Sequence, residues 1–154
     1  MAPQAELSLQ NPVHDLEILR NHIREGRFQR SLSLLTAFAS LMSGLEVSYE
    51  HYRGSYSQRV MYTPVILSAA LTCAGVAGFF SRRMAKTALP LASAIIVANG
   101  VQGVYLHARG IHQKPGGFKN FRYNMEMGPP LMAPLLVTLV GGMGLIAAVL
   151  RREK

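Results

Sequence analysis

Four long apolar stretches, in which Glu46 is the one charged residue, constrain this chain more than any other feature. Its 16 Lys/Arg and 8 Asp/Glu residues lie almost entirely between these stretches. An amphipathic helix of a soluble protein carries polar residues along one face at every turn, and these stretches do not. Crossing a bilayer core of about 30 Å takes about 20 apolar residues. The pattern predicts an all-α integral membrane protein, a four-helix bundle with spans at about 31–48, 60–80, 87–106 and 129–150.

Residues 1–30 are predicted to form a cytoplasmic N-terminal segment that precedes the transmembrane domain, residues 31–154. Asn11 is expected to cap a helix that has Pro12 at its first position. Apolar residues then recur at helical spacing, opposite two arginines: Val13, Leu16, Leu19 and Ile23 face away from Arg20 and Arg24. This pattern predicts an amphipathic helix that lies on the membrane surface or bends near Gly26 into the first span.

The distribution of basic residues predicts the orientation. With four spans both termini lie on one side, and that side carries ten basic residues: Arg20, Arg24, Arg27, Arg30, Arg82, Arg83, Lys86, Arg151, Arg152 and Lys154. The other side carries six: Arg53, Arg59, Arg109, Lys114, Lys119 and Arg122. The positive-inside rule then places both termini in the cytoplasm.

Residues 127–153 resemble small bacterial inner-membrane proteins, although no family or activity follows from the resemblance. The expected location is therefore the inner (plasma) membrane, with membrane lipids as partners. The net charge of +8 is explained by residues that flank spans and contact lipid headgroups. No basic helix with interleaved aromatics is present, so no nucleic-acid partner is expected.

The candidate site lies at the outer edge of the predicted bundle. Two carboxylates four residues apart share a helix face at the end of the first span, and histidines and a third carboxylate follow elsewhere. The candidate metal ligands are Glu46, Glu50, His51, His107, His112 and Glu126. Carboxylates and imidazoles are the ligands of iron, manganese, zinc and copper sites. The alternative is an ion-paired rim, in which Glu50 bonds Arg53 and Glu46 bonds Arg109.

A transition metal is the cofactor that this cluster suggests, and haem is not expected. Haem-binding bundles place histidines inside their spans, whereas His51 and His107 lie at the predicted outer boundary. Cys73 is the only cysteine, which excludes a multi-cysteine metal site. The sequence has no nucleophile motif or phosphate-binding loop, so an enzyme is the less favoured interpretation.

Small residues and two amides occupy the predicted spans. The glycines Gly75, Gly78, Gly100, Gly103, Gly141, Gly142 and Gly144 either pack the four helices together or form a face that docks a second protein. Asn99 and Gln102 are expected to face the interior and bond another helix. A search for an inverted pair of two-helix halves finds no matching residues, so no internal repeat is expected.

Three functions fit these features. The first is a non-catalytic accessory or stabilising subunit of a larger membrane complex, for example a redox complex. Association into a homo-oligomer is a further form of this role. It is favoured by the surplus of glycines and by the long, structured outer loop at residues 107–128. The second is a redox protein that uses the outer-edge metal cluster. The third is a small oligomeric transporter with Asn99 and Gln102 along its path.

Overall fold

The computed structural model describes residues 12–152, and within them the chain is helical and contains no strand. Its elements follow in order, with short 3-10 helices labelled η: α1 (Pro12–Glu25), α2 (Arg27–Arg53), η1 (Arg59–Met61), α3 (Tyr62–Phe80), α4 (Arg82–Lys86), α5 (Ala88–His112), η2 (Gly117–Asn120), α6 (Phe121–Glu126) and α7 (Met132–Val149). Asn11, the predicted cap, and Lys154 lie outside the described residues.

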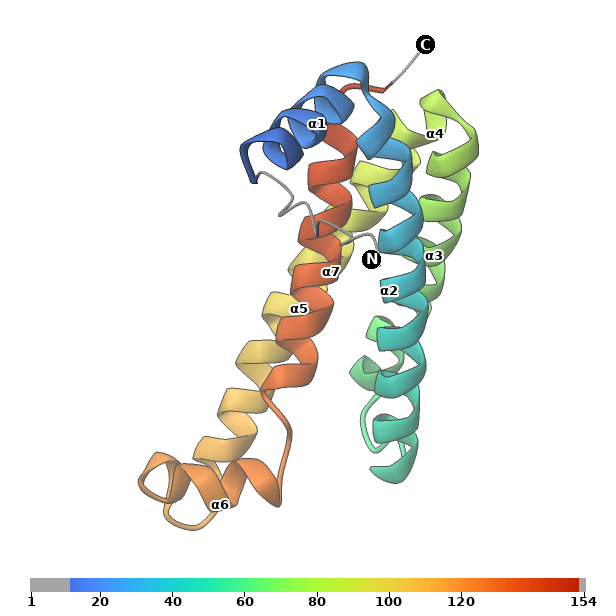
Figure 1. Cartoon of the computed structure of the whole chain (residues 1–154). Helices are drawn as coiled ribbons and strands as arrows, with labels where there is room; N and C mark the ends of the chain where they lie inside the picture. The colour runs from blue at the N-terminus through green and yellow to red at the C-terminus, as the bar shows by residue number, and fades with distance from the viewer. Residues whose placement is uncertain (1–11, 153–154) are drawn as a thin grey trace, which may run out of the picture.

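Four helices in the described part of the chain are long and apolar enough to cross a membrane, as predicted. They form two antiparallel hairpins, α2 with α3 and α5 with α7 (Figure 1). The hairpins pack together at the end that carries α4 and diverge at the end that carries α6. We call these the closed end and the open end. The all-α prediction and the four candidate spans are thus confirmed, and they indicate a multi-pass membrane protein.

The helices differ from the predicted spans mainly at the open end. Helix α2 ends at Arg53, five residues beyond the predicted end at residue 48. At the closed end it begins at Arg27, so the expected boundary at residue 30 falls inside it. Helix α5 continues to His112, six residues beyond the predicted end. Tertiary contacts explain this extension, because Ile111 is fully buried and Gly110 lies against Pro129. The long connection is therefore shorter than expected, and it is structured by η2 and α6.

The last span begins later than the sequence suggests. The predicted span starts at Pro129 and Pro130, but α7 begins at Met132. A proline disfavours helical geometry in the residue before it, so Pro130 keeps Pro129 out of the helix. Pro134 lies in the first turn of α7, where its missing N–H breaks no helical hydrogen bond.

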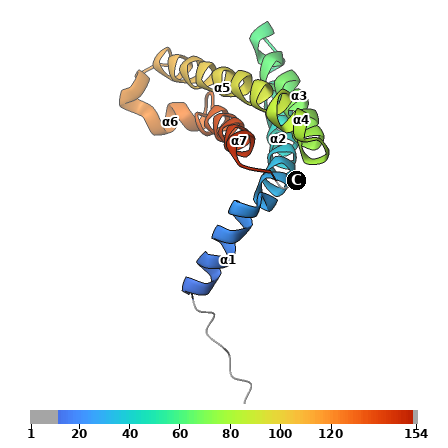
Figure 2. The ribbon, with the colours of Figure 1, turned by 90° about the horizontal axis from the view of Figure 1, so that it is seen from above.

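The N-terminal amphipathic helix is present as α1, and the chain bends after it. Gly26 has a left-handed backbone (φ 82°) that separates α1 from α2. Figure 2 shows α1 extending away from the bundle at the closed end. Its apolar residues Leu16 and Leu19 are exposed, at 66% and 45%.

The two hairpins are related by an internal repeat. Residues 44–54 read GLEVSYEHYRG and residues 100–110 read GVQGVYLHARG, with glycine, tyrosine, histidine, arginine and glycine at matching positions. The first stretch lies on α2 and the second on α5, and these helices run in the same direction. The expectation of no internal repeat is therefore wrong, because the two halves are parallel copies rather than inverted ones.

Packing follows the same repeat. Gly44 of α2 lies against Ser68 of α3, and its counterpart Gly100 lies against Thr138 of α7, with no room for a Cβ at either glycine. Ser68 and Thr138 each follow a first-turn proline, Pro64 or Pro134, by four residues. The first helix of each hairpin also packs against the second helix of the other. This arrangement has approximate two-fold symmetry about an axis along the bundle.

Basic side chains hold the closed end together. Arg152 donates hydrogen bonds to the carbonyls of Gly78 and Phe79 at the end of α3. Arg30 also donates to Phe79 O (3.3 Å), and Lys86 donates to Leu150 O (2.7 Å) at the end of α7. The last carbonyls of a helix lack partners within it and attract cations. These bonds satisfy them and connect neighbouring helices.

Candidate functional site

A cleft of about 570 Å³ separates the two hairpins at the open end. One wall comes from α2, η1 and α3, and the other from α5, the segment before α7 and α7 itself. At its deep end Asn99 Nδ2 donates to Thr63 Oγ1 (2.9 Å), which connects α5 to α3. The volume is within the range of sites for small molecules and cofactors.

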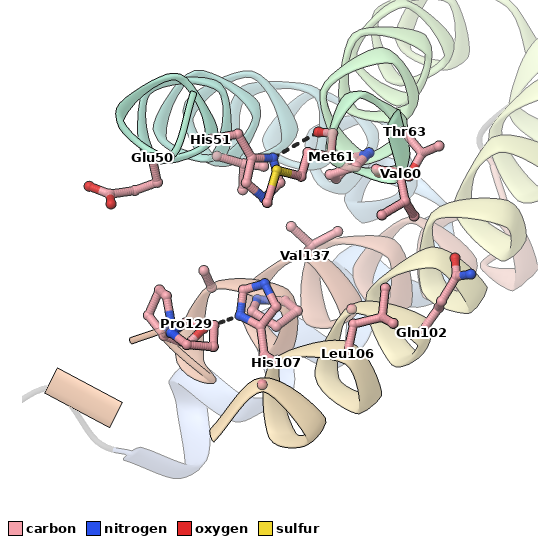
Figure 3. Close-up of a pocket in the computed structure, with 18 of the residues that line it drawn as sticks. Glu50, His51, Val60, Met61, Thr63, Gln102, Leu106, His107, Pro129 and Val137 are labelled. Carbon is pink, nitrogen blue, oxygen red and sulfur yellow. Dashed lines mark hydrogen bonds between the residues drawn. The ribbon is translucent and has the colours of Figure 1, made fainter. Parts of the chain in front are cut away.

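His51 and His107 face each other across this cleft (Figure 3). They occupy matching positions in the repeat, His51 on α2 and His107 on α5. His51 Nδ1 lies 2.7 Å from the carbonyl oxygen of Met61, and His107 Nδ1 lies 2.8 Å from that of Pro130. Each carbonyl lies just before the second helix of the same hairpin, so both imidazoles are held in the same way.

These bonds determine which ring nitrogen carries the proton. A carbonyl oxygen accepts hydrogen bonds and cannot donate them, so both Nδ1 atoms must be N–H donors. In the neutral ring Nε2 is then left with a free lone pair. Metal-binding histidines are commonly oriented in this way, by a backbone carbonyl at the other nitrogen. The cleft therefore has two oriented imidazoles, one on each wall.

The other four predicted ligands do not join this pair. Glu50 lines the cleft but forms an ion pair with Arg53 (3.1 Å), and in Figure 3 its carboxylate points away from the imidazoles. Glu46 is exposed and does not line the cleft. His112 contacts the ring of Phe118 instead.

Glu126 is likewise separate, because it pairs with Arg122 on α6 (3.1 Å). Among residues 12–152, no three His, Cys, Asp or Glu side chains are grouped to hold a metal ion. The alternative interpretation was an ion-paired rim with two pairs. The structure contains the pair of Glu50 with Arg53, whereas Glu46 and Arg109 are not paired with each other. The six-residue metal site thus stays a prediction. Of its members, His51 and His107 are the two that face each other across the cleft.

Asn99 and most of the glycines have identifiable partners, whereas the bond expected of Gln102 is not present among the described residues. Asn99 bonds Thr63 across two helices as expected, and Gln102 lines the cleft. Gly75 lies against Ser33 and Ala37, and Gly141 lies against Ile96 and Val97. Of the predicted glycines, Gly142 has open space around the position of a Cβ. Internal packing therefore accounts for the glycine surplus that favoured a protein partner.

A buried stripe of small polar residues was not among the features predicted from the sequence. On α2 it comprises Gln29, Ser33, Thr36, Ser40 and Ser43, and Ser68 and Ser93 face it from α3 and α5. Most of these hydroxyls bond backbone carbonyls, Thr36 to Leu32 O at 2.7 Å and Ser40 to Ser68 O at 2.9 Å. Their spacing of three to four residues was a usable signal, because polar residues in spans face other helices.

Fold and cleft together define a class: a multi-pass membrane protein made of two repeated helix hairpins with a ligand-sized cleft between them. Comparison of the chain with protein-family models, curated proteins and solved structures finds no match.

Proposed function

We propose that this protein binds a lipid-soluble molecule in the cleft, with its polar or metal-containing centre between His51 and His107. The observation that carries this proposal is the pair of equivalent imidazoles, each oriented by a backbone carbonyl (2.7 and 2.8 Å). Orienting one histidine serves packing as well as binding. Two histidines that are oriented in the same way on opposite walls of one cleft suit a ligand that contacts both.

The surroundings favour a largely apolar ligand. Val60, Leu106 and Val137 line the cleft beside the histidines, so apolar surface lies close to two strong polar groups. Such a combination is typical of sites for small organic ligands. Residues of both candidate membrane hairpins line the cleft, so a membrane-dissolved molecule can enter it between them.

Filling the cleft tests this proposal. Ala133 of α7 lines it, whereas Leu136 on the same helix is 50% exposed on the bundle surface. Native mass spectrometry of protein extracted gently from its own membranes should detect a bound small molecule in the wild type. Ala133→Trp should lose that mass and Leu136→Trp should keep it. A wild-type protein without bound mass, or loss in neither variant, would contradict the proposal.

The accessory-subunit role now has weaker support, because the glycines pack within the chain. Co-purification with a fixed partner would restore support for this role.

For the orientation in the membrane, we propose that the closed end faces the cytoplasm. Five basic residues lie at that end: Arg82, Arg83, Lys86, Arg151 and Arg152. A fluorescent-protein fusion at the C-terminus should then be bright, and a secreted-phosphatase fusion there should be inactive.

A further inference from the structure

We infer that the cleft is a haem site in which His51 and His107 supply the two axial ligands of the iron. This inference rests on the proposed function and names its ligand class. It departs from the sequence-based expectation against haem, which placed both histidines at the outer boundary of the predicted spans. Helices α2 and α5 continue past them, so each histidine lies on a helix that lines the cleft.

The number of protein ligands favours haem, in which a porphyrin macrocycle already holds the iron, over a bare metal ion. In the part of the chain that the structure describes, no third His, Cys, Asp or Glu side chain joins the two imidazoles to form a metal-binding group. A zinc ion takes three or four protein ligands, and calcium takes more, all of them oxygens. Haem iron is held by four nitrogens of its macrocycle and accepts one axial ligand on each face. Two opposed imidazoles complete that set.

Symmetry supports the same ligand. The histidines are counterparts in the repeat, and Nδ1 of each is bonded to the chain just before α3 or just before α7. They therefore approach the cleft from two related walls, as Figure 3 shows. An iron atom at the two-fold axis would be ligated in the same manner from both sides. A ligand with unlike ends would use the two equivalent histidines unequally.

Charge at the mouth of the cleft fits the acidic side chains of haem. Arg53 and Arg109 are also counterparts in the repeat, each two residues beyond its histidine toward the open end. Arg53 lines the cleft and pairs with Glu50 there, and both arginines are exposed. Guanidinium groups bind carboxylates strongly. The macrocycle would thus lie among apolar residues, with its two propionates directed to this basic edge.

Two axial imidazoles have a chemical consequence. A six-coordinate iron has no open position for oxygen or substrate, so such a haem serves one-electron exchange between its ferrous and ferric states. In this protein the residues would contribute ligation, orientation of both rings by Met61 O and Pro130 O, and apolar contacts for the macrocycle.

Titration with ferric haem tests the inference. The purified full-length protein in lipid nanodiscs should bind one haem per chain and give the Soret band and electron paramagnetic resonance of a low-spin, bis-imidazole iron. His51→Ala and His107→Ala should each lose the low-spin signal, whereas His112→Ala should keep it. His107→Met should restore six-coordination with a more positive reduction potential. Circular dichroism checks that every variant is folded.

Other outcomes overturn the inference in distinguishable ways. Haem binding that is unchanged in both alanine variants would be non-specific and would contradict axial ligation. Tight binding of Cu²⁺ or Zn²⁺ alone, without haem binding, would assign the pair to a bare metal. A different bound mass that Ala133→Trp removes would refute haem but retain the ligand-binding cleft. If neither haem nor any other molecule binds, both proposals fail.

Discussion

The two ends of this bundle differ although they are built from the same repeated hairpins. At the closed end small residues bring the helices together, and Arg152, Lys86 and Arg30 bond the carbonyls where helices end. At the open end the hairpins separate around a cleft, and each histidine bonds only within its own hairpin. The difference indicates that the closed end supplies stability and leaves the open end free to bind.

The largest effect is expected from a side chain added where the helices pack closely. At Gly75 a Cβ would lie 2.8 Å from the carbonyl oxygen of Ser33, so Gly75→Leu must push α2 from α3. We expect a loss of about 3 kcal/mol in the free energy of unfolding, or failure to fold. Gly142→Leu is the matched control, since it has nothing within 4 Å. Thermal unfolding in detergent measures both, and equal melting temperatures would refute the packing.

The next effect concerns the basic side chains of the closed end. Arg152 is 9% exposed and bonds two carbonyls of α3, whereas its neighbour Arg151 is exposed. Arg152→Gln should lower stability by about 2 kcal/mol, because bonds from a charged donor to otherwise unpaired carbonyls are lost. Arg151→Gln should change little. If the two variants unfold at the same temperature, the closed end is not held in this way.

Equal and smaller effects are expected for the two histidines in protein without haem. Each forms one hydrogen bond to a backbone carbonyl of its own hairpin, so His51→Ala and His107→Ala should each cost about 1 kcal/mol. Equal losses of stability in the two variants are the informative result, because the two histidines occupy matching positions in the internal repeat. His112→Ala serves as the control. A large cost for one variant alone would argue that the two histidines are not equivalent.

The smallest effect on stability is expected in α1. Leu16 and Leu19 are exposed and lie on a helix that extends from the bundle (Figure 2), so Leu16→Glu with Leu19→Glu should shift stability by less than about 0.5 kcal/mol. In proteoliposomes the same change should release α1 from the lipid surface and speed trypsin cleavage at Arg20 and Arg24. Marked destabilisation in detergent would show instead that this face packs on protein.

The sequence was informative wherever the bilayer alone dictates the pattern. Spanning hydrocarbon requires long apolar helices, so the four spans and the all-α fold could be predicted without tertiary information. The helix after Pro12 and the bend at Gly26 were also visible, because helical spacing and a left-handed glycine are local features. Asn99 could be assigned to an interhelical bond, since an amide in a span needs a partner.

The features that could not be predicted from the sequence depend on tertiary contacts. The end of α5 depends on burial of Ile111 and on Gly110 against Pro129, which no local pattern indicates. Six candidate ligands were grouped because they share a depth, but the side chains of Glu46, His112 and Glu126 point elsewhere. The repeat is detectable in residues 44–54 and 100–110, and alignment of these two stretches as parallel halves pairs His51 with His107 by sequence alone.

Thiol accessibility along α7 tests the contrast between the two ends most directly. In a Cys73→Ala background, single cysteines at Ala133, which lines the cleft, and at Ala147, fully buried near the closed end, can be reacted with a water-soluble thiol reagent in proteoliposomes permeable to it. Because the thiolate needs water to form and react, the cysteine at 133 should react at least on the order of tenfold faster. Equal protection at both positions would contradict an open cleft, and faster reaction at 147 would reverse the assignment of the two ends.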